Sequence, residues 1–118
     1  MDSLKNTTQA VKEFCEARDW DQFHSPKELA IGISNEANEL LSLFRFKSKE
    51  EMEKMLKDDA KRQQISQELA DVLYFLLRFS QMYDFDLLEA IKEKMEINNR
   101  KYPVEKSKGK NVKYNELY

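Results

Sequence analysis

Helix-breaking residues are nearly absent from this chain, and their scarcity constrains its fold more than any other feature. Only two glycines and two prolines occur among its 118 residues, and no segment has the pattern of a strand. Capping patterns mark three helix starts: Ser25-Pro26-Lys27-Glu28, Ser48-Lys49-Glu50-Glu51 and Asp86-Leu87-Leu88-Glu89. The sequence therefore predicts an all-α protein.

The positions of the helices follow from these caps together with the apolar periodicity. We expect four main helices at about 4–17, 25–44, 59–83 and 86–101, and a short, highly charged helix at about 48–57. Pro103 cannot continue the last of them. Because the connections are short, we predict an antiparallel four-helix bundle with a short extra helix. Residues 1–118 are expected to form one domain, of which about 104–118 is a polar, lysine-rich tail.

Several global properties bear on partners and compartment. The helix expected at 59–83 is apolar round most of its circumference, so we expect a homo-oligomer, either a dimer or a tetramer. The formal net charge of -2 gives no global attraction to nucleic acid or to an anionic membrane. The chain has a single cysteine, no apolar run near ~18 residues and no signal-like start, so we expect a cytoplasmic protein with no membrane partner.

Two pairs of acidic residues lie in otherwise apolar helical stretches: Glu36 with Glu39, and Glu68 with Asp71. The i, i+3 spacing places both acids of a pair on one helical face. At ~100° per residue, the first acid of each pair falls within the apolar arc and the second falls at its edge. A carboxylate that leaves water is costly unless a cation compensates it, so we predict that the two helices present a shared metal site.

An all-oxygen donor set favours Mg²⁺, with Mn²⁺ as the second candidate, and Mg²⁺ commonly bridges to substrate phosphates. A carboxylate-bridged di-iron bundle normally needs two Glu-x-x-His motifs, whereas the only histidine, His24, lies outside the expected bundle helices. The simpler alternative is ordinary surface charge, as expected for Glu50, Glu51 and Glu53 among their neighbouring lysines. Because the acidic pair occurs twice in matching apolar settings, we favour the metal site.

The chain resembles a known family through three motifs, Glu36-x-x-Glu39, Glu68-x-x-Asp71 and Asn98-x-x-Lys101-Tyr102-Pro103. The family is the MazG-type all-α nucleoside triphosphate pyrophosphohydrolases, and within it the dCTP pyrophosphatase group is the most similar. The resemblance implies that a nucleoside triphosphate is hydrolysed between its α and β phosphates in nucleotide-pool house-cleaning. It also implies that the four acids are catalytic residues that hold Mg²⁺.

The last main helix carries a possible phosphate-binding face. Lys94, Asn98 and Lys101 share one side of that helix at spacings i, i+4 and i+7. The spacing alone fits either phosphate binding or a solvated basic helix end. Basic residues near the C-terminus of a helix interact favourably with the helix dipole in either case. The resemblance favours phosphate binding.

Aromatic residues suggest where a nucleobase would lie. Trp20 lies near Gln22 and His24 in the segment 18–24, and an indole ring suits base stacking. From the residues alone, the more common role of an aromatic residue in a connector is to plug the end of the bundle. The resemblance implies that Trp20, Gln22 and His24 line the nucleotide pocket. By the same resemblance Phe46 and Phe75 are also candidates to bind the substrate, since they stand where the relatives have a pocket tryptophan and a tyrosine. These replacements leave the preferred base and sugar open.

A second hypothesis comes from a different functional class. The chain would then be a non-catalytic helical scaffold or regulatory oligomer in which the acids bind a structural cation. That hypothesis requires neither the Trp20 segment nor the face of Lys94 and Lys101, so the presence of all three elements favours the enzyme. A lysine-rich tail is usually just solvated, and we do not expect nucleic-acid binding from it.

Overall fold

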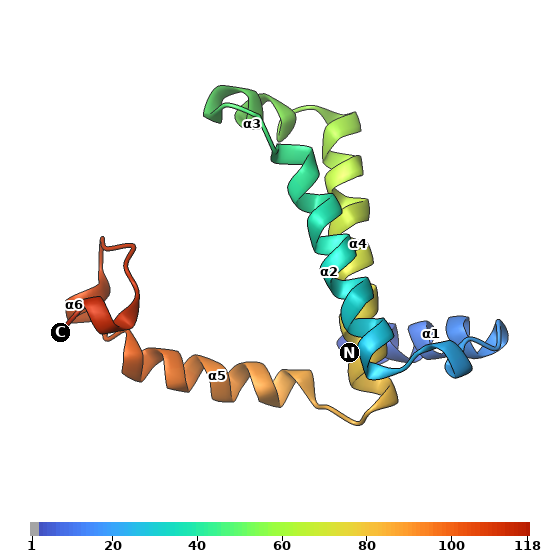
Figure 1. The fold of residues 1–118 in the computed structure, drawn as a ribbon. Coiled ribbons are helices and arrows are strands. Elements are labelled where there is room, and N and C mark those ends of the chain that lie inside the picture. The colour runs from blue at the N-terminus through green and yellow to red at the C-terminus, as the bar shows by residue number, and fades with distance from the viewer. Residues whose placement is uncertain (1–2) are drawn as a thin grey trace. The chain divides into compact units, whose positions relative to one another are not determined.

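The computed structural model describes residues 3–118, which contain helices and no strand (Figure 1). In chain order the elements are α1 (Ser3–Ala17), the 3-10 helix η1 (Asp21–Phe23), α2 (Pro26–Phe44), α3 (Lys49–Met55), α4 (Asp59–Met82), α5 (Leu87–Lys101), α6 (Val104–Ser107) and the 3-10 helix η2 (Tyr114–Glu116). The all-α prediction is confirmed, and each of the five predicted helices is present with its ends within two residues of those expected.

The helix starts agree with the capping patterns. Ser48 and Glu51 form a full capping box, in which each side chain accepts a hydrogen bond from the backbone N–H of the other residue. The hydroxyl of Ser25 accepts from the backbone N–H of Glu28, and a carboxyl oxygen of Asp86 accepts from that of Glu89. Such a cap contributes about 1 kcal/mol by satisfying a backbone donor that the helix leaves unpaired. Local sequence therefore sets these boundaries.

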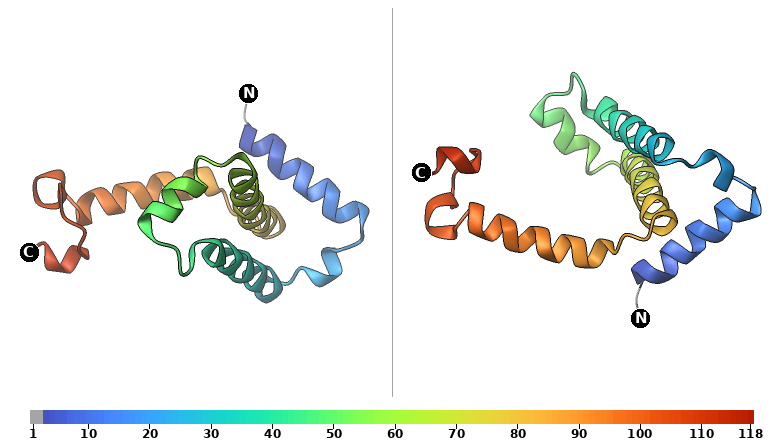
Figure 2. Two further views of the ribbon diagram at one scale, coloured as in Figure 1. Left: turned by 90° about the horizontal axis from the view of Figure 1, so that it is seen from above. Right: turned by 60° about the horizontal axis from the view of Figure 1, so that its bottom comes forward.

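The chain divides into two compact units, and the division falls between Asp84 and Phe85. In the first unit α2 and α4 run antiparallel and side by side, as both further views also show, and α1 contacts α4 (Figure 2). A Cβ atom added to Gly32 of α2 would lie 2.6 Å from the ring of Phe75 of α4. Glycine therefore lets the two helices approach closely at the level just before the acidic residues of α2.

The buried apolar side chains of the first unit come from three helices: Cys15, Leu29, Ile65 and Leu77. Other apolar side chains on α2 and α4 remain exposed, and these include Ile31, Leu41, Leu69, Leu73 and Leu76. Among residues 3–118, no helix has both the length and the apolar character needed to cross a membrane.

The second unit holds α5, α6 and η2. Two elements within it, α6 and η2, were not predicted from the sequence. The backbone N–H of Tyr114 donates to the hydroxyl of Tyr102 at 3.2 Å, and their rings meet edge to face with centroids 6.2 Å apart. The ammonium of Lys101 lies 4.7 Å from the centroid of the Tyr114 ring. These contacts pack the start of η2 against the end of α5.

Candidate functional site

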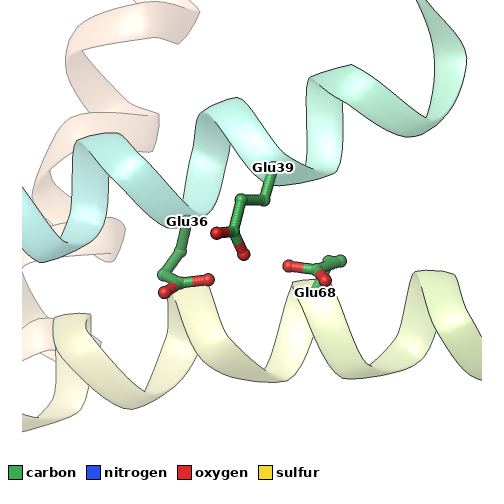
Figure 3. Close-up of side chains that lie close together, drawn as sticks. All are labelled: Glu36, Glu39 and Glu68. Carbon is green, nitrogen blue, oxygen red and sulfur yellow. The ribbon is translucent and has the colours of Figure 1, made fainter.

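Three acidic side chains converge between α2 and α4 (Figure 3). Glu36 and Glu39 extend from α2 and Glu68 extends from α4, and one carboxyl oxygen from each lies within 4.8 Å of the others. The i, i+3 spacing explains why both acids of α2 reach the side that faces α4. The structure thus brings together three of the four acids that the sequence singled out.

Asp71, the fourth acid, lies one helical turn after Glu68 and is exposed. It is outside the group of three whose oxygens converge. Its charge nevertheless reaches the group, because it contributes to raising the pKa of both Glu36 and Glu68. Asp71 therefore belongs to the electrostatic surroundings of the cluster.

The environment of the cluster disfavours negative charge. Burial is the largest cause that raises the pKa of Glu36 to about 6, followed by a hydrogen bond to Glu39 and by the charges of Glu39, Asp71 and Glu68. Burial also comes first in raising the pKa of Glu68, followed by the influence of Glu39 and Asp71. Every neighbouring group that shifts these two pKa values is itself a carboxyl group, so none of them supplies compensating positive charge.

Two oxygens of the cluster are buried without a partner. Within residues 3–118, neither Oε2 of Glu36 nor Oε2 of Glu68 receives a hydrogen bond. An unsatisfied buried polar atom is costly, and a buried carboxylate is more so. A hard divalent cation removes that cost, because carboxylate oxygens are the ligands that Mg²⁺ and Mn²⁺ prefer. The donor set therefore fits such an ion.

The acids of α3 show what ordinary surface charge looks like in this chain. Glu50, Glu51 and Glu53 are all exposed. Glu51 accepts a hydrogen bond from the backbone N–H of Ser48, and this capping contact lowers the pKa of its carboxyl group. The α3 acids thus differ from Glu36 and Glu68 in exposure, and Glu51 differs in the direction of its pKa shift.

The segment 18–24 lies between α1 and α2. The Trp20 ring is half-buried and meets the Phe14 ring edge-on with centroids 5.7 Å apart, so part of its surface packs against α1. It also lies 6.2 Å from the His24 ring, at an interplanar angle of 62°. Gln22 is exposed, and its amide donates to the backbone oxygen and the carboxylate of Asp19. Trp20 and His24 thus form one aromatic group, whereas Gln22 bonds back to its own turn.

Phe75 and Phe46 have contrasting environments. Phe75 is half-buried on α4, against Gly32 and edge-on to Tyr74. Phe46 follows α2, is 88% exposed and has a φ of 67°, with the Arg45 guanidinium 4.5 Å from its ring centroid. Trp20 precedes α2 whereas Phe46 follows it, and a helix of 19 residues is about 28 Å long. One chain therefore does not bring Trp20 and Phe46 to the same base.

Lys94, Asn98 and Lys101 lie on α5, in the second unit. Lys94 is exposed, whereas Asn98 and Lys101 are half-buried. Since α5 is one continuous helix from Leu87 to Lys101, the three residues share a face as predicted. Their binding to phosphates stays a prediction.

Sequence reasoning missed Arg78, which is 1% exposed on α4. The signal that could have found it is a charged residue within the apolar run Leu76-Leu77-Arg78-Phe79. Its guanidinium donates to Nδ1 of His24 at 2.9 Å and to the side chain of Gln81, and it forms an ion pair with Asp21. Because His24 accepts from Arg78, it belongs to this second site and is not a ligand of the acidic cluster.

Fold and site together define a class: an all-α protein in which two antiparallel helices hold converging carboxylates suited to a divalent cation. A model of the MazG-like family matches residues 31–117, and the chain belongs to that family. The resemblance found in the sequence is thereby confirmed. The matched range contains all four acids together with Phe46, Phe75, Lys94, Asn98 and Lys101, whereas the segment 18–24 precedes it.

Individual relatives extend the similarity over nearly the whole chain. The dCTP pyrophosphatase 1 proteins of Bos taurus and Mus musculus are each 35% identical over 115 residues, which is 98% of this chain and 68% of each relative. The Homo sapiens protein of the same name is 34% identical over the same lengths. The crystal structure of a pyrophosphatase from Archaeoglobus fulgidus has a TM-score of 0.81 and 36% sequence identity, and the match covers 87% of this chain and 94% of that one.

Proposed function

We propose that this protein is a Mg²⁺-dependent nucleoside triphosphate pyrophosphohydrolase that releases a nucleoside monophosphate and pyrophosphate. The observation that carries the proposal is the buried, unpartnered carboxyl oxygen on each of two facing helices. Membership of the MazG-like family and the similarity to dCTP pyrophosphatase 1 supply the reaction class. The substrate class that follows is a (deoxy)nucleoside triphosphate, with dCTP as the first candidate.

In this proposal Glu36, Glu39 and Glu68 hold the metal, and Asp71 supports them from the next turn of α4. A bound Mg²⁺ would neutralise phosphate oxygens and would lower the pKa of a coordinated water. The same carboxylates are the candidates for the general base. Mn²⁺ has the same ligand preferences and is expected to substitute for Mg²⁺.

The remaining predicted residues would bind the nucleotide. Lys94, Asn98 and Lys101 would bind the phosphates through cationic and amide donors. Trp20 would stack on the nucleobase, and His24 would hydrogen-bond to it. The closeness of the Trp20 and His24 rings supports the nucleotide pocket predicted for the segment 18–24. Gln22 and Phe75 are kept as secondary candidates for that pocket.

We further propose that the protein acts as a homo-oligomer, a dimer or a tetramer, in which the helices complete a four-helix bundle. Two observations support this proposal. Apolar side chains of α2 and α4, such as Leu41, Leu69 and Leu73, are exposed in the single chain. Trp20 and Phe46 also lie at opposite ends of α2, so Phe46 would have to come from another copy to contact the base.

Product analysis by phosphorus NMR tests the proposed function. A panel of ribo- and deoxyribonucleoside triphosphates is incubated with the protein in Mg²⁺ and, separately, in chelator. We expect monophosphate and pyrophosphate in Mg²⁺ and no product in chelator. Release of orthophosphate would mean a different cleavage. The absence of product from every nucleotide would favour the alternative of a non-catalytic scaffold with a structural cation.

A further inference from the structure

Arg78 is a buried cation, and two of its three side-chain hydrogen bonds go to one short segment, residues 18–24. Its Nε donates to Nδ1 of His24 at 2.9 Å, and one of its terminal nitrogens forms the ion pair with Asp21. The other terminal nitrogen donates to Oε1 of Gln81 at 2.6 Å. The hydroxyl of Tyr83 adds a hydrogen bond of 2.6 Å to the backbone oxygen of His24. Arg78 of α4 therefore fixes the ring of His24, and Tyr83, the residue that follows α4, fixes its backbone.

The contact with Arg78 also determines where the proton of His24 lies. A guanidinium has hydrogen-bond donors and no acceptor. Nδ1 of His24 must therefore offer its lone pair, and the proton of the neutral imidazole resides on Nε2. Burial and the positive charge of Arg78 lower the pKa of His24, and the charge of Asp21 opposes them. The ring is consequently neutral near pH 7, with one donor.

That donor lies in the aromatic group of the proposed nucleotide pocket. The centroids of the His24 and Trp20 rings are 6.2 Å apart, and Nε2 of His24 has no hydrogen-bond partner among residues 3–118. A base stacked on the Trp20 ring would bring its polar edge within reach of neighbouring side chains. The group that an N–H donor recognises on that edge is a hydrogen-bond acceptor such as a ring carbonyl.

We propose that Arg78 is a positioning residue that locks His24 as an Nε2–H donor, and that this donor recognises a carbonyl oxygen of the substrate's nucleobase. The inference rests on the proposed function for its ligand, whereas the locked ring can be tested without it. Cytosine, uracil, thymine and guanine carry a ring carbonyl, and adenine does not. Arg78 would thus contribute to base selectivity without touching the substrate.

Nitrogen-15 NMR of the untagged protein tests the lock directly, because His24 is its only histidine. We expect Nε2 protonated, Nδ1 unprotonated, and a scalar coupling between Arg78 Nε and His24 Nδ1 through their hydrogen bond. Protonated Nδ1, or the absence of that coupling, overturns the proposal. In Arg78→Met the second tautomer should become populated and the pKa of His24 should rise. Arg62→Met, on the exposed side of α4, should change neither. If Arg78→Met does not fold, the spectrum of the unmodified protein decides.

Kinetics test the consequence for the base. In Arg78→Met, KM for dCTP should rise about three- to tenfold, whereas kcat and the KM for dATP should change less. An equal rise for both nucleotides would overturn the recognition of a carbonyl. The NMR and the kinetic experiments together distinguish a failure of this inference from a failure of the proposed function. A locked His24 in a protein that hydrolyses no nucleotide removes the proposed function alone, and protonated Nδ1 in an active enzyme removes this inference alone.

Discussion

The first unit contains two sites where charged groups are buried, and the sites differ in whether those groups have hydrogen-bond partners. At the acidic cluster, Glu36 and Glu68 each bury a carboxyl oxygen that has no partner in the part of the chain described here. At the other site, Arg78 is more fully buried, yet each of its three guanidinium nitrogens donates to a side chain. A satisfied charge holds the segment 18–24 in place. An unsatisfied one destabilises the fold and is retained where a ligand compensates it.

The two sites lie on the same helix, so the difference is not one of fold. Helix α4 provides Glu68 on the side that faces α2, and it provides Arg78 nearer its C-terminal end, where the segment 18–24 returns to it. The contrast leads to opposite expectations for mutation. Removing charge from the acidic cluster should spare the fold and stop the reaction, whereas removing Arg78 should weaken the fold.

The largest effect is expected for Glu68→Gln. The substitution removes a metal ligand and also relieves repulsion among carboxylates, so hydrolysis should fall at least about 100-fold while the melting temperature without metal stays the same or rises. Steady-state kinetics in Mg²⁺ and thermal unfolding in chelator provide the two readouts. Near-full activity of this variant would contradict the assignment of Glu68 as a ligand.

Arg78→Met should instead lower stability. The substitution keeps most of the aliphatic volume but removes three hydrogen bonds, one of them to the exposed carboxylate of Asp21. We expect a loss of about 2 kcal/mol in the free energy of unfolding, measured by urea denaturation. Arg62→Met on the same helix is the matched control and should lose much less. Equal stability of the two variants would contradict the structural role of Arg78.

Trp20→Ala examines the segment that Arg78 holds. Because stacking contributes mainly to ground-state binding, KM should rise about tenfold for all bases while kcat changes less. The Trp20 ring also packs on Phe14, so a small fall in melting temperature is expected. An unchanged KM for every nucleotide would remove Trp20 from the pocket and leave it as a plug at the end of the unit.

The smallest effect concerns pH. The pKa of Glu36 is raised from 4.5 to about 6 in the folded protein. Between these values the folded state binds more protons than the unfolded state, so this contribution to stability is present below pH 4.5 and is lost as pH rises through about 6. The lowered pKa of His24 acts oppositely, since its contribution is lost as pH falls below 6.5.

Comparison with Glu36→Gln isolates the contribution of Glu36 to the pH dependence of stability. The melting temperature of the metal-free variant should exceed that of the unmodified protein at pH 7, and the difference should shrink toward pH 5. Thermal unfolding in chelator at several pH values provides the measurement. A difference that does not depend on pH would mean that the Glu36 carboxyl has no raised pKa.

The sequence allowed prediction of those parts of the structure that depend on neighbouring residues. Capping patterns placed the helices, and the i, i+3 rule placed Glu36 and Glu39 on one face. The acids of α2 and α4 lie in similar apolar arcs, and this similarity predicted that the two helices would face each other through their acids. Asp71 shows the limit of this reasoning, because a position at the edge of an arc does not specify whether a side chain reaches the centre of the cluster.

Contacts between distant residues could not be predicted in this way. Arg78 and His24 are 54 residues apart in the sequence, and their hydrogen bond depends on how the segment 18–24 returns to α4. The periodicity of α4 indicated an apolar surface and gave no sign that a guanidinium could be satisfied within it. The packing of Tyr102 against Tyr114 similarly depends on a turn with no strong local signature.

Direct measurement of metal binding tests the central claim, that the unpartnered carboxylates of α2 and α4 form a cation site. Electron paramagnetic resonance detects free Mn²⁺, so titration of the ion into unmodified protein, Glu68→Gln and Glu53→Gln compares the cluster with a solvated acid of α3. We predict that the unmodified protein and Glu53→Gln take up Mn²⁺, that Glu68→Gln binds it far more weakly, and that Mg²⁺ competes. Equal uptake by Glu68→Gln, or no uptake by the unmodified protein, would contradict the account.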